Sequence, residues 1–143
     1  MKTSNKIINQ DIDYILEDIQ NKVLWLAVYM VDYANKQRVN SSGLKVGGHQ
    51  ASSSSVATIM TYLFFEFMKN TDLISIKPHS SPVYHAIQYL LGNLDKEYLK
   101  TLRAFGGLQA YPSRTKDPDN VDFTTGSVGL GAVAPNFAWS VSL

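Results

Sequence analysis

Apolar residues recur at spacings of three and four along positions 12–34, the period of an amphipathic helix. This pattern predicts one long helix, or two helices joined near Asn21. Asp11 stands just before the first apolar position and is the expected N-cap. The polar, basic run 35–38 is typical of a helix end.

The middle of the chain alternates between loops and apolar segments. A loop rich in serine and glycine spans 40–48, and a serine among 52–55 is the expected cap of the next helix. Residues 56–68 are apolar nearly all round, which predicts a buried helix. Residues 73–77 are short, rich in β-branched side chains and followed by proline, so we expect a strand there.

Two further helices are predicted downstream. One spans 83–91 and is closed by Gly92, and a shorter one spans 95–102. Residues 105–123 form a long irregular stretch, 124–131 a glycine turn, and a last helix starts at Ala132. The resulting fold class is α/β, helix-rich with few parallel strands. Because one strand cannot make a sheet, its partners must come from later sequence or from another chain.

Composition narrows the class of protein. The 143 residues suit one domain, and 45% hydrophobic with 17% charged residues is enough apolar material for a core. A net charge of +1 without a basic stripe argues against nucleic acid. Cysteine is absent, and no apolar run reaches the roughly 20 residues that a bilayer requires. We expect a cytoplasmic protein that binds neither nucleic acid nor membranes.

Three histidines are candidates for chemistry. His79 follows the predicted strand directly, the position where α/β sheets bind ligands, and His49 lies between a glycine loop and a helix. The alternative for either is a loop histidine hydrogen-bonded to backbone. His85 lies inside a predicted helix and does not share a helix face with His79. We expect it to point to solvent or to pack against neighbouring side chains. The acidic residues are scattered along the chain, and no metal site is expected.

Two loop features complete the candidate site. Gly126, Ser127 and Val128 open a glycine-rich turn before a helix, which lets a ligand approach backbone amides closely. Its glycine order fits neither a dinucleotide fingerprint nor a phosphate-binding P-loop, and a tight packing turn is the alternative. Tyr111, followed by proline, either places a phenol in a cleft or lies in an exposed turn.

Four motifs in order resemble the first half of the transketolase-type domain that binds thiamine diphosphate. The glycine-histidine and tyrosine-proline motifs are more similar to the homodimeric pyruvate dehydrogenase decarboxylating subunit than to transketolase. The resemblance covers about residues 23–139. The motifs are Gly47-Gly48-His49-Gln50-Ala51-Ser52, Lys77-Pro78-His79-Ser80-Ser81-Pro82-Val83-Tyr84, Leu108-Gln109-Ala110-Tyr111-Pro112 and Thr124-Thr125-Gly126-Ser127-Val128-Gly129-Leu130-Gly131.

The resemblance implies roles for particular residues. The turn at Gly126, Ser127 and Val128 would contact the aminopyrimidine ring of the cofactor through its backbone. His49 and His79 would line the channel near the thiazolium carbon, in contact with substrate or cofactor phosphate. Tyr111 would stand where pyruvate dehydrogenases keep a tyrosine and transketolases a histidine.

One departure from the family pattern sets the expected activity. The family holds magnesium and the diphosphate with a Gly-Asp-Gly segment, which does not occur here, and the activating glutamate comes from a second domain. Residues 1–143 are therefore expected to form a partial domain that is inactive alone and binds no cofactor alone, whereas the complete enzyme would hold thiamine diphosphate with magnesium.

The resemblance also implies partners and alternatives. The expected partner is a second copy or a complementary chain, and the expected substrate of the complete enzyme is a 2-oxo acid or a ketose. A transketolase-like ketol transferase subunit and a non-catalytic interaction remnant of the same fold are the alternatives.

Overall fold

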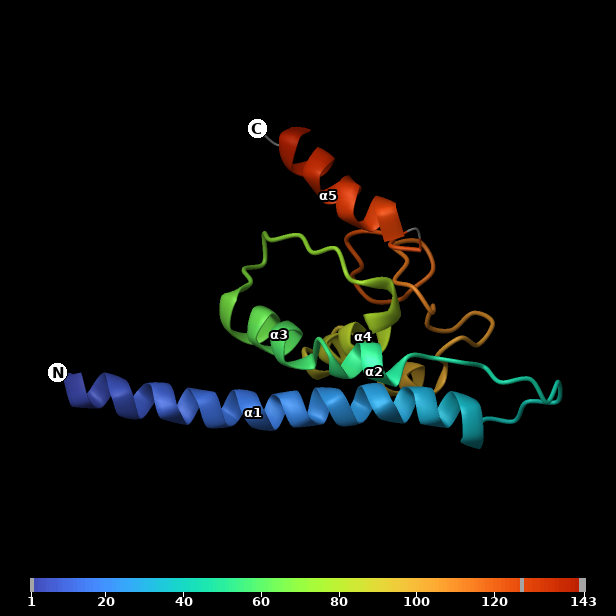
Figure 1. Ribbon diagram of the computed structural model, residues 1–143, viewed down its shortest axis with the longest axis horizontal. Helices are drawn as coiled ribbons and strands as arrows, with labels where there is room; N and C mark the ends of the chain where they lie inside the picture. Colours follow the sequence, from blue (N-terminus) through green and yellow to red (C-terminus); the bar gives the residue numbers. More distant parts are fainter. Residues whose placement is uncertain (1, 127, 142–143) are drawn as a thin grey trace.

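A computed structural model describes residues 2–126 and 128–141, with side chains described for 11–126 and 129–141. A single long helix, α1 (Lys2–Asp32), runs along one side of the molecule, and a π-helical turn (Tyr33–Gln37) ends it (Figure 1). The prediction of one helix is confirmed, but Asp11 lies inside it and does not cap it. The sequence around Asp11 is polar but contains no helix breaker, so the helix continues through it.

The two faces of α1 differ in burial. Its buried face, spaced at three and four residues, packs against α2, α3 and α4. The opposite face carries Trp25 stacked on Tyr29, with ring centroids 5.3 Å apart, and Trp25 is 64% exposed. The buried apolar residues of α1 are Leu16, Val23, Leu26, Ala27, Met30 and Val31.

The segment predicted as one buried helix, 56–68, forms two pieces, α3 (Ala57–Tyr62) and a π-helical turn (Leu63–Phe67). A short helix, α2 (Gln50–Ser54), precedes them. The serine run lies within α2 instead of capping the next helix, and the Ser54 hydroxyl donates to the Gln50 carbonyl one turn earlier. Ile59 and Phe67 are about two thirds exposed, so the expectation of full burial was wrong.

Residues 73–77 have no regular secondary structure and pair with no strand in the described chain. The Ile74 amide donates to the Asp122 carboxylate at 2.9 Å, and the Ser75 hydroxyl donates to the Gly131 carbonyl. The segment therefore bonds to the side chain of Asp122 and to a carbonyl of α5, and not to a partner strand among the described residues. The predicted strand is not formed, and the described residues form helices and loops without a strand, so the α/β expectation is not met by these residues.

Helix α4 (Ser81–Leu90) lies at the centre of the molecule, preceded by a 3-10 turn (Pro78–Ser80) (Figure 1). Residues 81–88 are all buried, and Gly92 ends the helix with a φ of +81°, as its sequence predicts. The shorter predicted helix is a 3-10 turn (Lys96–Lys100). Apolar side chains of α1, α4 and the following loop form one continuous core.

The last helix, α5 (Val128–Val141), stands away from α1 at the far side of the molecule (Figure 1). It begins earlier than the sequence predicts, so Gly129 and Gly131 lie inside the helix and not in a glycine turn. The irregular stretch 105–123 is confirmed. Within the described residues no helix is both long and apolar enough to span a bilayer.

Candidate functional site

The two candidate histidines lie side by side, although 30 positions separate them in the sequence. The ring centroids of His49 and His79 are 4.0 Å apart, and the planes are tilted by 35°. His49 is the N-cap position of α2, and His79 lies in the 3-10 turn that leads into α4. The Ser80 hydroxyl donates to the Ser52 carbonyl and so joins these two segments.

Tyr111 completes an aromatic cluster on the other side of His79. Its ring meets the His79 ring edge-on, with centroids 5.3 Å apart, and 37% of the residue is exposed. The Ser81 hydroxyl donates to the Ala110 carbonyl at 2.9 Å, which fixes the tyrosine loop on the start of α4. The structure therefore brings together all three residues that the sequence singled out for chemistry.

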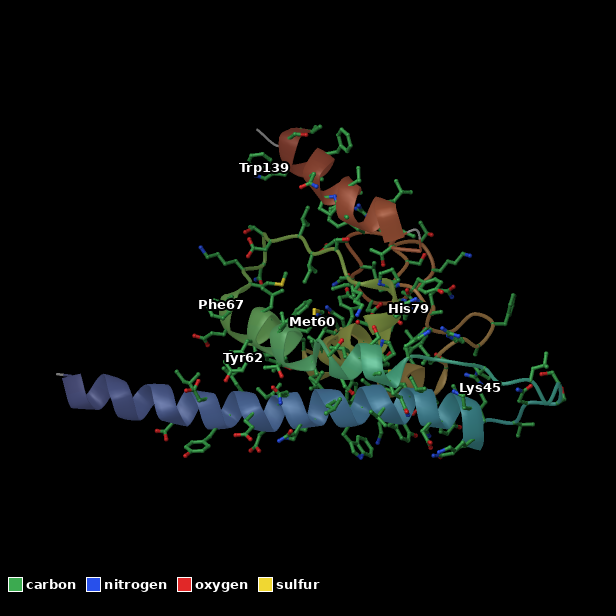
Figure 2. The ribbon with its side chains drawn as sticks, in the orientation of Figure 1. Lys45, Met60, Tyr62, Phe67, His79 and Trp139 are labelled. Atoms are coloured by element: carbon green, nitrogen blue, oxygen red, sulfur yellow. The ribbon has the colours of Figure 1, made fainter. Side chains whose placement is uncertain are left out.

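His79 lies toward the middle of the molecule, where the segments before α4 meet the loops (Figure 2). Its Nδ1 atom is buried and has no hydrogen-bond partner. Burial lowers the pKa of His79, and the charges of His49, Arg103 and Lys77 lower it further. The ring is therefore neutral at pH 7 and can accept a proton from a bound ligand or donate a hydrogen bond to it.

Two side chains that the sequence reasoning missed hold the histidine loop in place. The side-chain amide of Asn35 makes two hydrogen bonds to the backbone of Gly47. Its Nδ2 donates to the Gly47 carbonyl at 2.8 Å, and its Oδ1 accepts from the Gly47 N–H at 2.9 Å. Arg103 donates to the Val46 carbonyl at 3.0 Å and lines a narrow pocket with His49 and His79. Neither stands in a motif, and only tertiary proximity reveals them.

Arg103 has an unusual backbone conformation. Its φ is +58°, in the left-handed region that costs a non-glycine residue about 1–2 kcal/mol. Its N–H donates to the Leu108 carbonyl at 2.8 Å, which closes the turn before the tyrosine loop. Arg103 therefore joins two loops, because its backbone bonds to Leu108 and its guanidinium bonds to Val46.

The glycine turn is only partly described. Ser127 lies outside the described residues, and of Val128 only the backbone is described, at the start of α5. The Thr125 N–H donates to the Pro112 carbonyl at 3.1 Å, so Gly126 follows a residue that is bonded next to Tyr111. A Cβ at Gly126 would meet no atom within 4 Å, so its backbone is open to approach.

His85 does not lie at this site. It is completely buried, and its Nδ1 lies 2.6 Å from an Asp119 carboxylate oxygen. Its Nε2 lies 4.0 Å from Asp117. The expectation that the acidic residues form no cluster was wrong, because residues 34 positions apart in sequence meet when the loop folds onto α4. No local pattern in the sequence could have indicated this contact.

Comparison with known proteins places the chain among relatives of one enzyme component. It is 33% identical over 124 residues to the pyruvate dehydrogenase E1 component of Escherichia coli K12. It is 33% identical over 129 residues to that of Buchnera aphidicola from Schizaphis graminum, and 31% identical over 134 residues to that of Cupriavidus necator. These matches cover 80%, 83% and 87% of the chain.

The chain is therefore related to the pyruvate dehydrogenase E1 components. It spans only about 13–14% of the length of these relatives. No protein-family model matches the chain. No solved structure matches it either.

Proposed function

We propose that the chain supplies one wall of a thiamine-diphosphate site in a pyruvate dehydrogenase-like enzyme. The observation that carries the proposal is the cluster of His49, His79 and Tyr111, three residues from separate motifs. The ring of His79 lies between the other two, 4.0 Å from that of His49 and 5.3 Å from that of Tyr111. The similarity to pyruvate dehydrogenase E1 components over most of the chain supports the same assignment.

The residues present fit one side of the cofactor. The unpartnered Nδ1 of His79 is a polar atom available to a ligand, and Gly126 leaves its backbone open. When bound, thiamine diphosphate supplies the electron sink for a carbanion next to a former carbonyl. The chain contains no Gly-Asp-Gly segment for magnesium and the diphosphate, so the second side of the site requires other residues.

The chain's own groups have distinct tasks in this proposal. His79, neutral at pH 7 because its pKa is lowered, donates a hydrogen bond to a developing alkoxide or transfers a proton at Nδ1. His49 exposes its imidazole beside it and lowers the pKa of His79. Tyr111 positions a phenol on the far side of His79, and its presence in place of a histidine favours a 2-oxo acid over a ketose.

The proposal includes a partner for the chain. Helix α5 exposes apolar side chains along most of its length, with Trp139 pointing outward at its far end (Figure 2). Exposed apolar surface of this kind is typical of association. We propose that a second copy or a complementary chain covers α5, and light scattering after size exclusion should show a dimer. These side chains are Leu130, Val133, Phe137, Trp139 and Val141.

A titration by NMR tests the proposed site. Thiamine diphosphate with Mg²⁺ is added to the full chain while the imidazole signals are followed. We expect weak binding, in the millimolar range because the metal ligands are missing, with shifts at His49 and His79 but none at His85. No pyruvate turnover is expected from the chain alone.

The matched control is the variant His79→Gln, which should lose the shift at His49. Absence of any shift up to millimolar cofactor, or an equal shift at His85, would overturn the assignment of the site. Micromolar binding would instead overturn the claim that the site is incomplete.

A further inference from the structure

A second group of ligating side chains lies inside the fold, away from the aromatic cluster. His85 on α4 meets Asp117 and Asp119 of the loop 105–123, and the side chains of all three are fully buried. One donor atom from each residue lies within 4.8 Å of the other two. Burying three ionisable groups away from water costs free energy unless each is paired, hydrogen-bonded or bound to a metal ion.

Two atoms of this group have no hydrogen-bond partner: His85 Nε2 and Asp119 Oδ1. The 2.6 Å contact of His85 Nδ1 with Asp119 places the ring proton on Nδ1 in a neutral imidazole. The Nε2 lone pair then faces the Asp117 Oδ1 atom at 4.0 Å. Two electron-rich atoms facing each other in a dry interior repel unless a positive charge lies between them.

The surrounding residues supply no such charge. Within the described residues neither carboxylate forms an ion pair with a lysine or arginine. A proton on Nε2 would also leave the gap unbridged, because 4.0 Å exceeds a hydrogen bond. Asp117 is held rigidly, since it accepts the backbone N–H groups of Gln109 and Ser113, each at 2.7 Å.

We propose that His85, Asp117 and Asp119 bind one divalent transition-metal ion, with Zn²⁺ as the best match. Zn²⁺ bonds to imidazole nitrogen at about 2.0–2.1 Å and to carboxylate oxygen at about 2.0–2.2 Å, so it spans atoms up to roughly 4 Å apart. A tetrahedral ion places two such ligands about 3.3–3.5 Å apart. His85 Nε2 and Asp117 Oδ1, which lie 4.0 Å apart, therefore have to move slightly closer when the ion binds. Mg²⁺ and Ca²⁺ prefer all-oxygen sites, and the imidazole disfavours them.

Asp119 holds the Nδ1 atom of His85 through Oδ2, and its Oδ1 atom, which has no hydrogen-bond partner, is the one available to the ion. The bound ion ties the loop that carries Tyr111 to α4. The site is therefore structural: it stabilises the loop on which the aromatic cluster depends.

Calorimetric titration of the full chain tests this proposal. The protein is stripped with a chelator, dialysed, and titrated with ZnCl₂ at pH 7, with MgCl₂ as the comparison. We expect one Zn²⁺ per chain, no response to Mg²⁺ and a higher Tm in the loaded protein. His85→Gln and Asp117→Asn should each weaken Zn²⁺ binding at least tenfold, by analogy with the 10–100-fold cost of losing a partner of a metal ligand.

The double variant His49→Gln/His79→Gln is the matched control, because an exposed histidine pair also attracts zinc. It should bind Zn²⁺ as the unaltered chain does. The proposal is overturned if the chain binds no Zn²⁺, if binding survives His85→Gln, or if the control abolishes it.

X-ray absorption of the Zn²⁺-loaded, unaltered chain keeps the proposal testable if His85→Gln does not fold. One imidazole and otherwise oxygen ligands are expected. Two imidazoles would assign the ion to His49 and His79 and refute the proposal.

Discussion

Gly48, the residue before His49, adopts a φ of +130° and lies against the core side of α1. A Cβ built there would stand 2.7 Å from one methyl carbon of Val31 and 3.0 Å from the other. The variant Gly48→Ala therefore faces two separate costs. The backbone conformation is strained for an alanine, by about 1–3 kcal/mol, and the clash adds about 1–3 kcal/mol of overpacking.

The variant Gly43→Ala separates these costs. Gly43 has a φ of +68° in the same loop, but a Cβ there would meet nothing within 4 Å. We expect it to lose about 1–2 kcal/mol from backbone strain alone. Gly48→Ala should be destabilised by about 2–6 kcal/mol, a large part of the 5–15 kcal/mol that holds a typical domain folded.

Urea unfolding followed by circular dichroism measures both variants. The change Val31→Ala in the Gly48→Ala background should recover part of the loss, with a coupling energy of about 0.5–3 kcal/mol. If Gly48→Ala costs no more than Gly43→Ala, or if the two changes are additive, the glycine does not pack against α1. Close packing on Val31 would then not be the reason that a glycine precedes His49.

Three further outcomes are expected. Tyr84→Phe should lower the free energy of unfolding in urea by about 1–2 kcal/mol, because the buried hydroxyl of Tyr84 donates to the Asn120 carbonyl. Burial and, to a smaller extent, nearby aspartates raise the pKa of this hydroxyl, so it keeps its proton. NMR titration should place the pKa of His79 below 6.5, and His49→Gln should raise it without restoring the usual value, since burial is the larger cause. Asn35→Ala should cost about 1–3 kcal/mol and speed amide exchange at Gly47, because two hydrogen bonds to that residue are lost.

The first outcome has a matched control, and each of the other two has a result that would contradict it. Tyr89→Phe, on the same helix but only partly buried, should change stability by less than about 0.5 kcal/mol. The sign of the histidine effect follows from its lowered pKa: the stability it contributes is present above pH 6.5 and is lost as pH falls through the folded pKa. A pKa at or above 6.5 would contradict the burial of that ring. Unchanged exchange in Asn35→Ala would show that the loop is held by other contacts.

Local patterns in the sequence were sufficient for much of the fold. The period of apolar residues predicts α1, and Gly92 marks the end of α4, because these depend on residues a few positions apart. The same patterns failed for residues 73–77. An extended backbone becomes a strand only beside a partner, and no strand is present in the described chain to pair with it.

For the candidate site too, the sequence predicts one part and only the folded structure shows the other. The motifs around His49, His79 and Tyr111 identify which side chains carry chemistry, since each motif is a short run of sequence. Only the folded chain shows that their rings touch. The burial of His85 against two aspartates lies beyond any sequence pattern, because it arises when the loop 105–123 packs onto α4 and excludes water from all three. The sequence by itself determines the chemical identity of each group, whereas tertiary packing sets the distances and the dielectric environment on which its chemistry depends.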